Sequence, residues 1–192
     1  MRRMPAHHPS MGVAMGVEAD ETGRAALALA RDAVEGCVRT GILVGPTLGL
    51  PWELRQASAA FVTLRARGRL RGCVGTVAPS RPDLAREIVA SAVAAATLDF
   101  RFLPVRPDEL PSLTYEVAIV DSLEAARGPE DLDPKTYGVV VEADGRRGVL
   151  LPDLDGVDRV EQQLAIAREK AELPDNAAVT LHRFRVRRHV ER

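Results

Sequence analysis

Residues 61–74 have the sequence Phe-Val-Thr-Leu-Arg-Ala-Arg-Gly-Arg-Leu-Arg-Gly-Cys-Val. The stretch contains two β-compatible runs, 61–65 and 69–74, which are joined around Gly68. Glycine readily takes the backbone angles that a tight turn needs, so the pattern predicts a β-hairpin. Its second strand carries Cys73, one of only two cysteines in the chain.

Helical and extended patterns flank this hairpin on both sides. Apolar residues spaced three and four apart predict helices over 22–40, 82–98 (capped by Ser80), and from 158 to Pro174. Alternating apolar residues and an Asp144-Gly145 turn predict a strand over 115–120, a second hairpin over 137–151 and a last strand within 179–190. This order lacks the βαβ alternation of a doubly wound sheet. The sequence therefore predicts an α+β fold with a mostly antiparallel sheet and flanking helices.

Length and composition indicate one compact domain. The chain has 192 residues, of which 46% are apolar and 28% are charged, and its formal net charge is −1. A chain of roughly 100–200 residues usually forms a single domain. We expect residues 1–17 to form a flexible N-terminal tail and residues 18–192 to form the domain. The near-neutral charge offers no global field for nucleic acid, so any anion site must be local.

Cellular location and cofactors are constrained mainly by what the sequence lacks. Cys37 and Cys73 form no CxxC pair, no disulfide framework and no zinc-ligand spacing, which favours a reducing, cytoplasmic location and predicts no metal or other cofactor. No apolar signal segment follows the basic start, and no run of about 18 apolar residues predicts a membrane span.

Cys73 is the best candidate for a reactive group. On a regular strand, residues two apart share a face, so Arg69, Arg71 and Cys73 are expected to point the same way. Neighbouring guanidiniums would lower the pKa of the thiol and favour the nucleophilic thiolate. Gly72 and Gly75 leave the backbone open to a ligand. The alternative is a β-bulge with tight packing and an inert Cys73.

Other polar residues allow several interpretations. Glu116 lies on a largely apolar strand and needs a partner, for which Arg71 and Arg101 are candidates; otherwise it serves as a general base or metal ligand. The histidines are placed in the tail or on the last strand, which does not support a Cys/His nucleophile pair; they are His7, His8, His182 and His189. Four arginines of the last strand either bind phosphates or form a solvated face; they are Arg183, Arg185, Arg187 and Arg188.

Residues 70–76, Leu-Arg-Gly-Cys-Val-Gly-Thr, resemble the hallmark Leu-Arg-Gly-Cys-Ile-Gly-Thr of the AMMECR-type domain family, whose prokaryotic members are called AmmeMemoRadiSam system protein A. Further similar stretches occur in the same order, at Phe61–Leu64, Arg101-Phe102 with Pro104, Glu109–Pro111, Tyr115–Val117 and Gly148–Pro152. The resemblance covers about residues 22–188. Arg168 stands where some members have a cysteine, which argues against a required second thiol.

The resemblance implies a two-lobed α+β fold, with a larger lobe that contains both termini, a smaller lobe, and the hallmark motif near a cleft between them. It implies a Memo-type protein and a radical SAM enzyme as partners. The leading hypothesis is an accessory component that binds a small molecule or partner in this cleft. There, Arg71, Gly72, Gly75 and Arg101 would bind the ligand, and Cys73, with Glu116, would supply the chemistry.

Two alternatives use the same residues differently. In the first, a Cys73-dependent enzyme modifies RNA or a nucleotide, with the arginines of the last strand on phosphates. In the second, a non-catalytic adaptor receives a partner strand at the glycine-rich hairpin edge, and Cys73 is only packed. The sequence thus leaves an enzymatic and a non-catalytic role open.

Overall fold

The computed structural model describes residues 11–42, 45–46, 49–174 and 176–191, and the side chains from residue 21 onward. It contains three α-helices, three short 3-10 helices and six strands. In chain order they are α1 (Met11–Thr40), η1 (Trp52–Arg55), β1 (Ala59–Ala66), β2 (Arg69–Gly75), α2 (Leu84–Thr97), η2 (Leu110–Ser112), β3 (Leu113–Ala126), η3 (Pro129–Asp131), β4 (Gly138–Ala143), β5 (Arg146–Leu150), α3 (Val160–Lys170) and β6 (Thr180–Val190). The predicted α+β class is confirmed.

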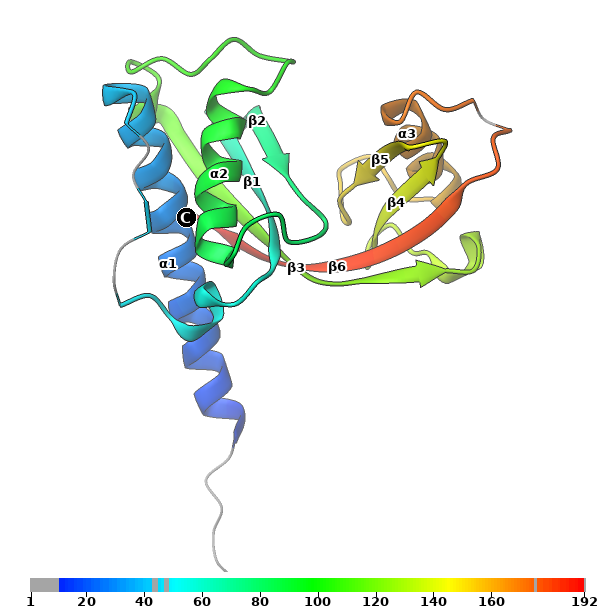
Figure 1. Cartoon of the computed structure of the whole chain (residues 1–192), viewed down its shortest axis with the longest axis horizontal. Helices are drawn as coiled ribbons and strands as arrows, with labels where there is room; N and C mark the ends of the chain where they lie inside the picture. Colours follow the sequence, from blue (N-terminus) through cyan, green and yellow to red (C-terminus); the bar gives the residue numbers. More distant parts are fainter. Residues whose placement is uncertain (1–10, 43–44, 47–48, 175, 192) are drawn as a thin grey trace, which may run out of the picture.

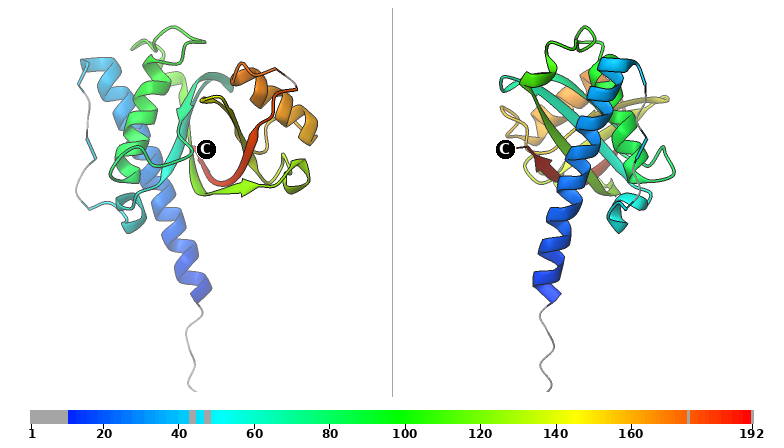
Figure 2. Two further views of the ribbon diagram at one scale, coloured as in Figure 1. Left: turned by 45° about the vertical axis from the view of Figure 1, so that its right-hand side comes forward. Right: turned by 90° about the vertical axis from the view of Figure 1, so that its left-hand side faces the viewer.

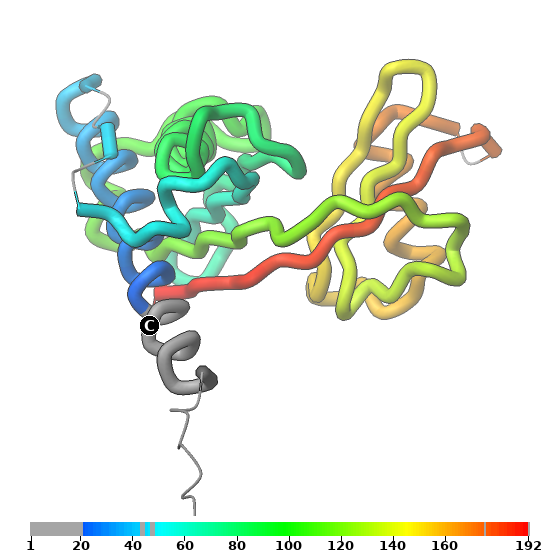
Figure 3. Tube along the Cα trace, turned by 60° about the horizontal axis from the view of Figure 1, so that its bottom comes forward, coloured from blue at the N-terminus to red at the C-terminus, as the bar shows by residue number. Residues whose placement is uncertain are grey.

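The six strands form one sheet in the order β2-β1-β3-β6-β4-β5, and all five pairings are antiparallel. The sheet is curled, with β2 and β5 as its two edges (Figures 1 and 2). The long strands β3 and β6 run side by side through the whole molecule (Figure 3). Because these two strands are shared, the two lobes are parts of one continuous sheet.

The larger lobe is built by α1 and α2 on one face of β1 and β3. Its core includes alternate residues of these strands, among them Val62, Leu64, Val117 and Ile119. The smaller lobe is built by α3 against β4, β5 and the start of β6, around Val139, Val141 and Leu181. The last strand returns to the larger lobe, where Arg31 of α1 pairs with Glu191 at 2.7 Å.

The opposite face of the sheet carries a separate apolar cluster, and we call it the inner face. Its members are Ala59, Phe61, Val77, Ala118, Val120, Val140 and Phe184. The rings of Phe61 and Phe184 stack with their centroids 6.3 Å apart. This cluster joins β1, β3, β4 and β6 across the curl.

The starts of α1 and α2 differ from the expectation in ways that matter for the fold. Helix α1 begins at Met11, well before Thr22; of the expected tail 1–17, residues 1–10 lie outside the described residues and 11–17 belong to α1. Helix α2 is capped by Asp83, whose carboxylate accepts a bond from the backbone N–H of Arg86. The expected cap, Ser80, instead donates to the buried carboxylate of Glu87.

Both predicted hairpins are present. The turn of the second one places Asp144 and Gly145 at φ values of 50° and 74°, as a type I′ turn requires. Among the helices of the described ranges, none is long and apolar enough to cross a membrane.

Candidate functional site

Cys73 lies on the edge strand β2 and faces the inner side of the sheet. It pairs in register with Thr63 of β1, which in turn pairs with Glu116 of β3. The Thr63 hydroxyl lies 3.3 Å from the Cys73 sulfur and donates to it. Three polar side chains thus form a row across β2, β1 and β3, next to the apolar cluster of the inner face.

A β-bulge separates Arg71 from Cys73. Gly72 pairs with Leu64 and Leu70 pairs with Arg65, so Arg71 is the extra residue on β2. A bulge interrupts the alternation of side chains along a strand. The expectation that Arg69, Arg71 and Cys73 share one face is therefore wrong.

Arg71 is engaged by a carboxylate instead of being open to a ligand. Its Nε and Nη2 donate to Glu109 at 2.7 and 2.9 Å, and Nη2 also lies 3.4 Å from the carbonyl of Pro104. This bidentate pair holds the pKa of Glu109 at about 2. Arg71 fastens the 104–109 loop to β2, which removes support for its expected role in binding a ligand anion.

Gly72 and Gly75 permit close packing within the protein. A Cβ at Gly72 would lie 2.1 Å from the carbonyl oxygen of Ala95 in α2. At Gly75 it would lie 2.4 Å from the Ala60 carbonyl oxygen and from the Phe61 Cα. The backbone at both glycines is thus covered by protein, and the expected ligand contacts there lose their support.

Asp99 and Arg101 hold the main chain of Cys73. The Cys73 N–H donates to Asp99 Oδ2 at 2.9 Å, and Arg101 donates to both oxygens of Asp99 at 2.9 and 2.6 Å. Arg101 Nη2 also reaches the Cys73 carbonyl at 3.5 Å. Bonds from Arg101 and from the Cys73 N–H lower the pKa of the 4%-exposed Asp99 carboxyl to about 2. Of the expected ligand-binding residues, Arg101 is thus the one placed beside Cys73 with part of its side chain exposed.

Burial raises the pKa of the Cys73 thiol. The Thr63 hydroxyl and the positive charge of Arg101 oppose this effect without cancelling it. Arg101 thus acts in the expected direction, but burial outweighs it, so the expected net lowering of the Cys73 pKa is wrong. In the resting protein, Cys73 is a partly buried thiol and not a preformed thiolate.

Glu116 has an arginine partner from the last strand. Arg188 Nη1 donates to Glu116 at 2.9 Å, and Arg188 Nη2 donates to the carbonyl of Pro152, which follows β5. The expected partners, Arg71 and Arg101, bind Glu109 and Asp99 instead. Glu116 is 7% exposed and belongs to a link between the lobes, an ion-pair role that favours neither a general base nor a metal ligand.

Lys170, the last residue of α3, brings a cation from the smaller lobe to this site. Its ammonium donates to the Val149 carbonyl of β5 at 3.1 Å and interacts electrostatically with Cys73, Asp99 and Arg101. Cys73 is on one edge strand and Val149 is on the other. The curl of the sheet therefore brings the thiol and the ammonium into one electrostatic environment.

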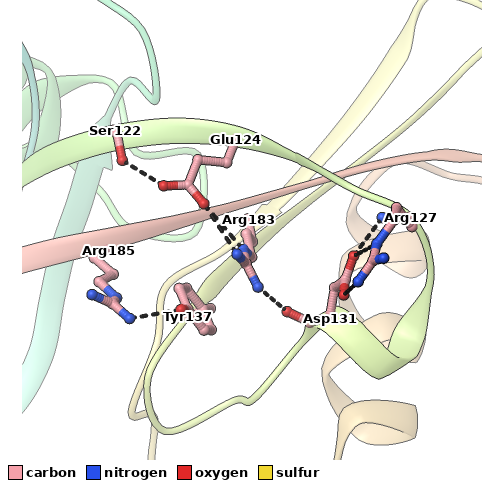
Figure 4. A network of polar contacts seen from close by, with 7 residues as sticks. All are labelled: Ser122, Glu124, Arg127, Asp131, Tyr137, Arg183 and Arg185. Atoms are coloured by element: carbon pink, nitrogen blue, oxygen red, sulfur yellow. Dashed lines mark hydrogen bonds and ion pairs between the residues drawn. The ribbon is translucent and has the colours of Figure 1, made fainter.

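The arginines of β6 are committed to partners within the protein. Figure 4 shows Arg183 bonded to Glu124 and to the Asp131 carbonyl, and Arg185 bonded to the hydroxyl of Tyr137 at 2.6 Å. Both guanidiniums lie over the Tyr137 ring. Arg187 pairs with Glu53 and Asp121, and Arg188 pairs with Glu116. These pairs withdraw support from the phosphate contacts that the RNA alternative requires.

Histidine and metal chemistry gain no support at Cys73. The His189 ring lies against Gly23 of α1, and His182 pairs in register with Ala125 and Val140, while His7 and His8 lie outside the described residues. The described ranges also contain no group of three or more His, Cys, Asp or Glu side chains that could hold a metal.

A separate small pocket of about 160 Å³ lies elsewhere on the sheet. It is lined by residues 57–59, 77–79 and 120–123 and includes none of Cys73, Asp99, Arg101 or Lys170. It lacks the convergent charges found around Cys73, so we place the candidate site at the thiol.

Sequence reasoning missed three members of this site: Thr63, Asp99 and Lys170. Two local signals were available. Asp99 stands between the large apolar residues Leu98 and Phe100, and Lys170 is one of only two lysines in a chain that otherwise uses arginine. Thr63 gave no signal beyond its place on β1.

Comparisons with known protein sequences point to one family. The family model described as AMMECR1 matches residues 27–189, which include both lobes. A Thermotoga maritima protein is 48% identical over 159 residues, covering 81% of this chain and 91% of that protein. A Clostridium acetobutylicum protein is 44% identical over 140 residues, covering 72% of this chain and 30% of that longer protein.

A solved structure gives the same result in three dimensions. The crystal structure of an uncharacterised Pyrococcus horikoshii protein superposes with a TM-score of 0.82 at 29% identity, covering 88% of this chain and 90% of that one. Since the family match covers most of the chain and includes the motif around Cys73, this chain belongs to the AMMECR1 family.

Proposed function

We propose that this chain is a cytoplasmic binding component of the AmmeMemoRadiSam system and that it acts through the surface around Cys73. Membership of the AMMECR1 family supports the association, because the prokaryotic system couples such a protein with a Memo-type protein and a radical SAM enzyme. In this proposal, residues 18–192 act as one domain, and one of these two proteins is the partner. The role is binding, and the thiol lies at the contact.

The observation that carries this proposal is an exposed apolar loop next to the thiol. Leu98, Phe100 and Leu103 are 75%, 95% and 84% exposed. Asp99 and Arg101 alternate with them in sequence and hold the main chain of Cys73. Exposed apolar side chains that gather in this way often mark interaction sites. The loop therefore couples an apolar surface to the strand that carries the thiol.

The loop also provides a reason for affinity. Removing a side chain such as Phe100 from water on binding contributes roughly 1.5–3 kcal/mol. A partner that covers Leu98, Phe100 and Leu103 would also approach Cys73, because Asp99 bridges the loop to β2. Apolar contact would then supply most of the affinity.

The test is a binding titration of the full chain with the Memo-type protein and with the radical SAM enzyme of the same organism. We expect one of them to bind, and Phe100→Ser to weaken the Kd about tenfold or more. Trp52→Ser is the control, because Trp52 is 63% exposed and lies in η1, outside this loop. Equal losses in the two variants, or no binding to either protein, would count against the proposal.

Cys73→Ala then separates the contribution of the thiol from that of the loop. A weaker complex would place the thiol at the contact. An unchanged Kd, with the Phe100→Ser loss intact, would remove Cys73 from the binding role and leave an adaptor that works through its apolar loop.

A further inference from the structure

The cations around Cys73 differ in whether a carboxylate already neutralises them. Arg101 is paired with Asp99 at 2.6 Å and Arg188 with Glu116 at 2.9 Å. Lys170 has no such pair among the described contacts, and its one described bond goes to the carbonyl of Val149. Lys170 is therefore the cation of this site that is available to an anionic ligand.

Donor geometry leads to the same conclusion. A lysine ammonium carries three N–H donors and no acceptor. The described bond to Val149 uses one of them and fixes the ammonium against β5. Up to two N–H groups remain for a ligand, which is enough to bind two oxygens of a carboxylate or phosphate group.

The surroundings of Lys170 make an anion favourable there. The residue as a whole is exposed, yet burial of its ammonium group lowers its pKa. The bond from the ammonium to the Val149 carbonyl holds this end of the side chain against the protein. A cation that has lost part of its hydration gains more from an anion than one in open water.

We propose that the two edge strands β2 and β5 together bind a small anionic molecule, with its carboxylate or phosphate oxygens on Lys170 at the β5 edge and the rest of the molecule against Cys73 of β2. This inference goes beyond the proposed partner binding, because it adds a small-molecule ligand at the same Cys73 surface. The anion contacts Lys170 in the smaller lobe and reaches Cys73 in the larger lobe, so the ligand spans both edges of the sheet.

The chain is suited to a direct test, because Lys135 and Lys170 are its only lysines. Lys135 is the matched control, since its ammonium already pairs with Asp158 at 2.7 Å. The protein is labelled with ¹³C-lysine, and the NMR signals of its two lysines are followed. It is titrated with inorganic phosphate and, separately, with acetate, while the chloride concentration is adjusted to keep the ionic strength constant. We expect a saturable shift of the Lys170 signal and a rise of its pKa, with no saturable change at Lys135. Parallel responses at both lysines, or none at Lys170, would overturn the proposal.

A second measurement links the anion to the thiol. In a Cys37→Ala background, Cys73 is alkylated by iodoacetate, which is anionic, and by iodoacetamide, which is neutral. Both reagents alkylate the same thiolate and release iodide, so the thiolate fraction cancels in their rate ratio. We expect the ratio of the iodoacetate rate to the iodoacetamide rate to be higher for Cys73 than for a free thiol. Lys170→Gln should lower this ratio about threefold or more, and Lys170→Arg should preserve it.

The controls keep this result separate from the proposed function. Lys135→Gln should leave the ratio unchanged, and a ratio that is the same in the wild type and Lys170→Gln would contradict the inference. If neither reagent alkylates Cys73 in the folded protein, the lysine titration alone tests whether Lys170 binds an anion. No partner protein takes part in either measurement, so loss of partner binding with an intact Lys170 response would reject the proposed function and keep the anion site.

Discussion

Gly72 in the larger lobe and Gly148 in the smaller lobe both allow a helix backbone to pack closely on an edge strand. A Cβ at Gly72 would lie 2.1 Å from the Ala95 carbonyl oxygen of α2, and a Cβ at Gly148 would lie 1.8 Å from the Ala167 carbonyl oxygen of α3. In each lobe a glycine on the edge hairpin lets a helix backbone approach the strand. The curled sheet therefore uses one device at both of its edges.

The two lobes differ in how much packing supports that contact. Helix α2 buries eight of its 14 residues and packs against α1 as well as the sheet, whereas α3 buries two of its 11. The thiol is thus fixed to the heavily packed lobe, and the ammonium of Lys170 is carried by the lightly packed one. The relation between the two groups depends on the strands that the lobes share.

Gly72→Ala should have the largest effect on stability. The added methyl group meets a helix carbonyl, so either α2 or β2 must shift within the main core. Overpacking of this kind costs about 1–3 kcal/mol and more where backbone must move, so we expect a loss of about 3 kcal/mol in the free energy of unfolding. Urea denaturation measures it, and a loss below about 1 kcal/mol would show that α2 adapts without cost.

Gly148→Ala should be milder and local, at about 2 kcal/mol, because α3 has fewer buried neighbours to disturb. Hydrogen exchange locates the effect: amides of α3 and β5 should lose protection while those of α2 keep theirs. The anion preference at Cys73 should also weaken, since Lys170 sits at the end of the displaced helix. Equal loss of protection in α2 would mean that the lobes unfold as one unit.

The larger lobe should also show a specific sensitivity to acid. The pKa of Asp99 is lowered from 3.8 to about 2, chiefly by its bonds with Arg101. A lowered pKa contributes stability above the unfolded-state value, and this contribution is lost as the pH falls toward the folded-state value. Wild type should therefore exceed Asp99→Asn by about 1 kcal/mol above pH 5, since Arg101 is partly exposed. The difference should shrink between about pH 4 and pH 2 in urea titrations; a difference that does not vary with pH would assign it to packing.

The helices and hairpins could be predicted from the sequence, because short runs of consecutive residues determine them. Apolar periodicity located all three helices, and the turn residues Gly68 and Asp144-Gly145 located both hairpins, because each signal lies within a few consecutive residues. The motif around Cys73 also indicated the family, because it is a run of seven consecutive residues. Fold class and family therefore required no long-range information.

The site was only partly predictable, because its contacts join distant residues. The bulge at Arg71 shifted the alternation of β2, so that Arg69 and Cys73 face opposite sides, and nothing in residues 69–75 alone marks it. Asp99 reaches Cys73 across 26 positions of sequence. Lys170 reaches the site from the opposite edge of the sheet, which only the curl determines. Burial, too, is a property of the whole fold, and it sets the direction of the Cys73 pKa.

The smallest predicted effect concerns Thr63, which tunes the thiol from within the larger lobe. Its hydroxyl donates to the Cys73 sulfur at 3.3 Å and lowers the pKa that burial raises. Thr63→Val keeps the shape of the side chain but removes the donor, so the apparent pKa of Cys73 should rise further. The pH dependence of iodoacetamide alkylation in the Cys37→Ala background measures this shift.

Lys170→Gln should raise the same pKa, because it removes a positive charge from the other lobe. If the two changes combined give the sum of their separate shifts, the two lobes act on the thiol independently; a larger combined shift would mean that the hydroxyl and the ammonium depend on one shared arrangement of the curled sheet.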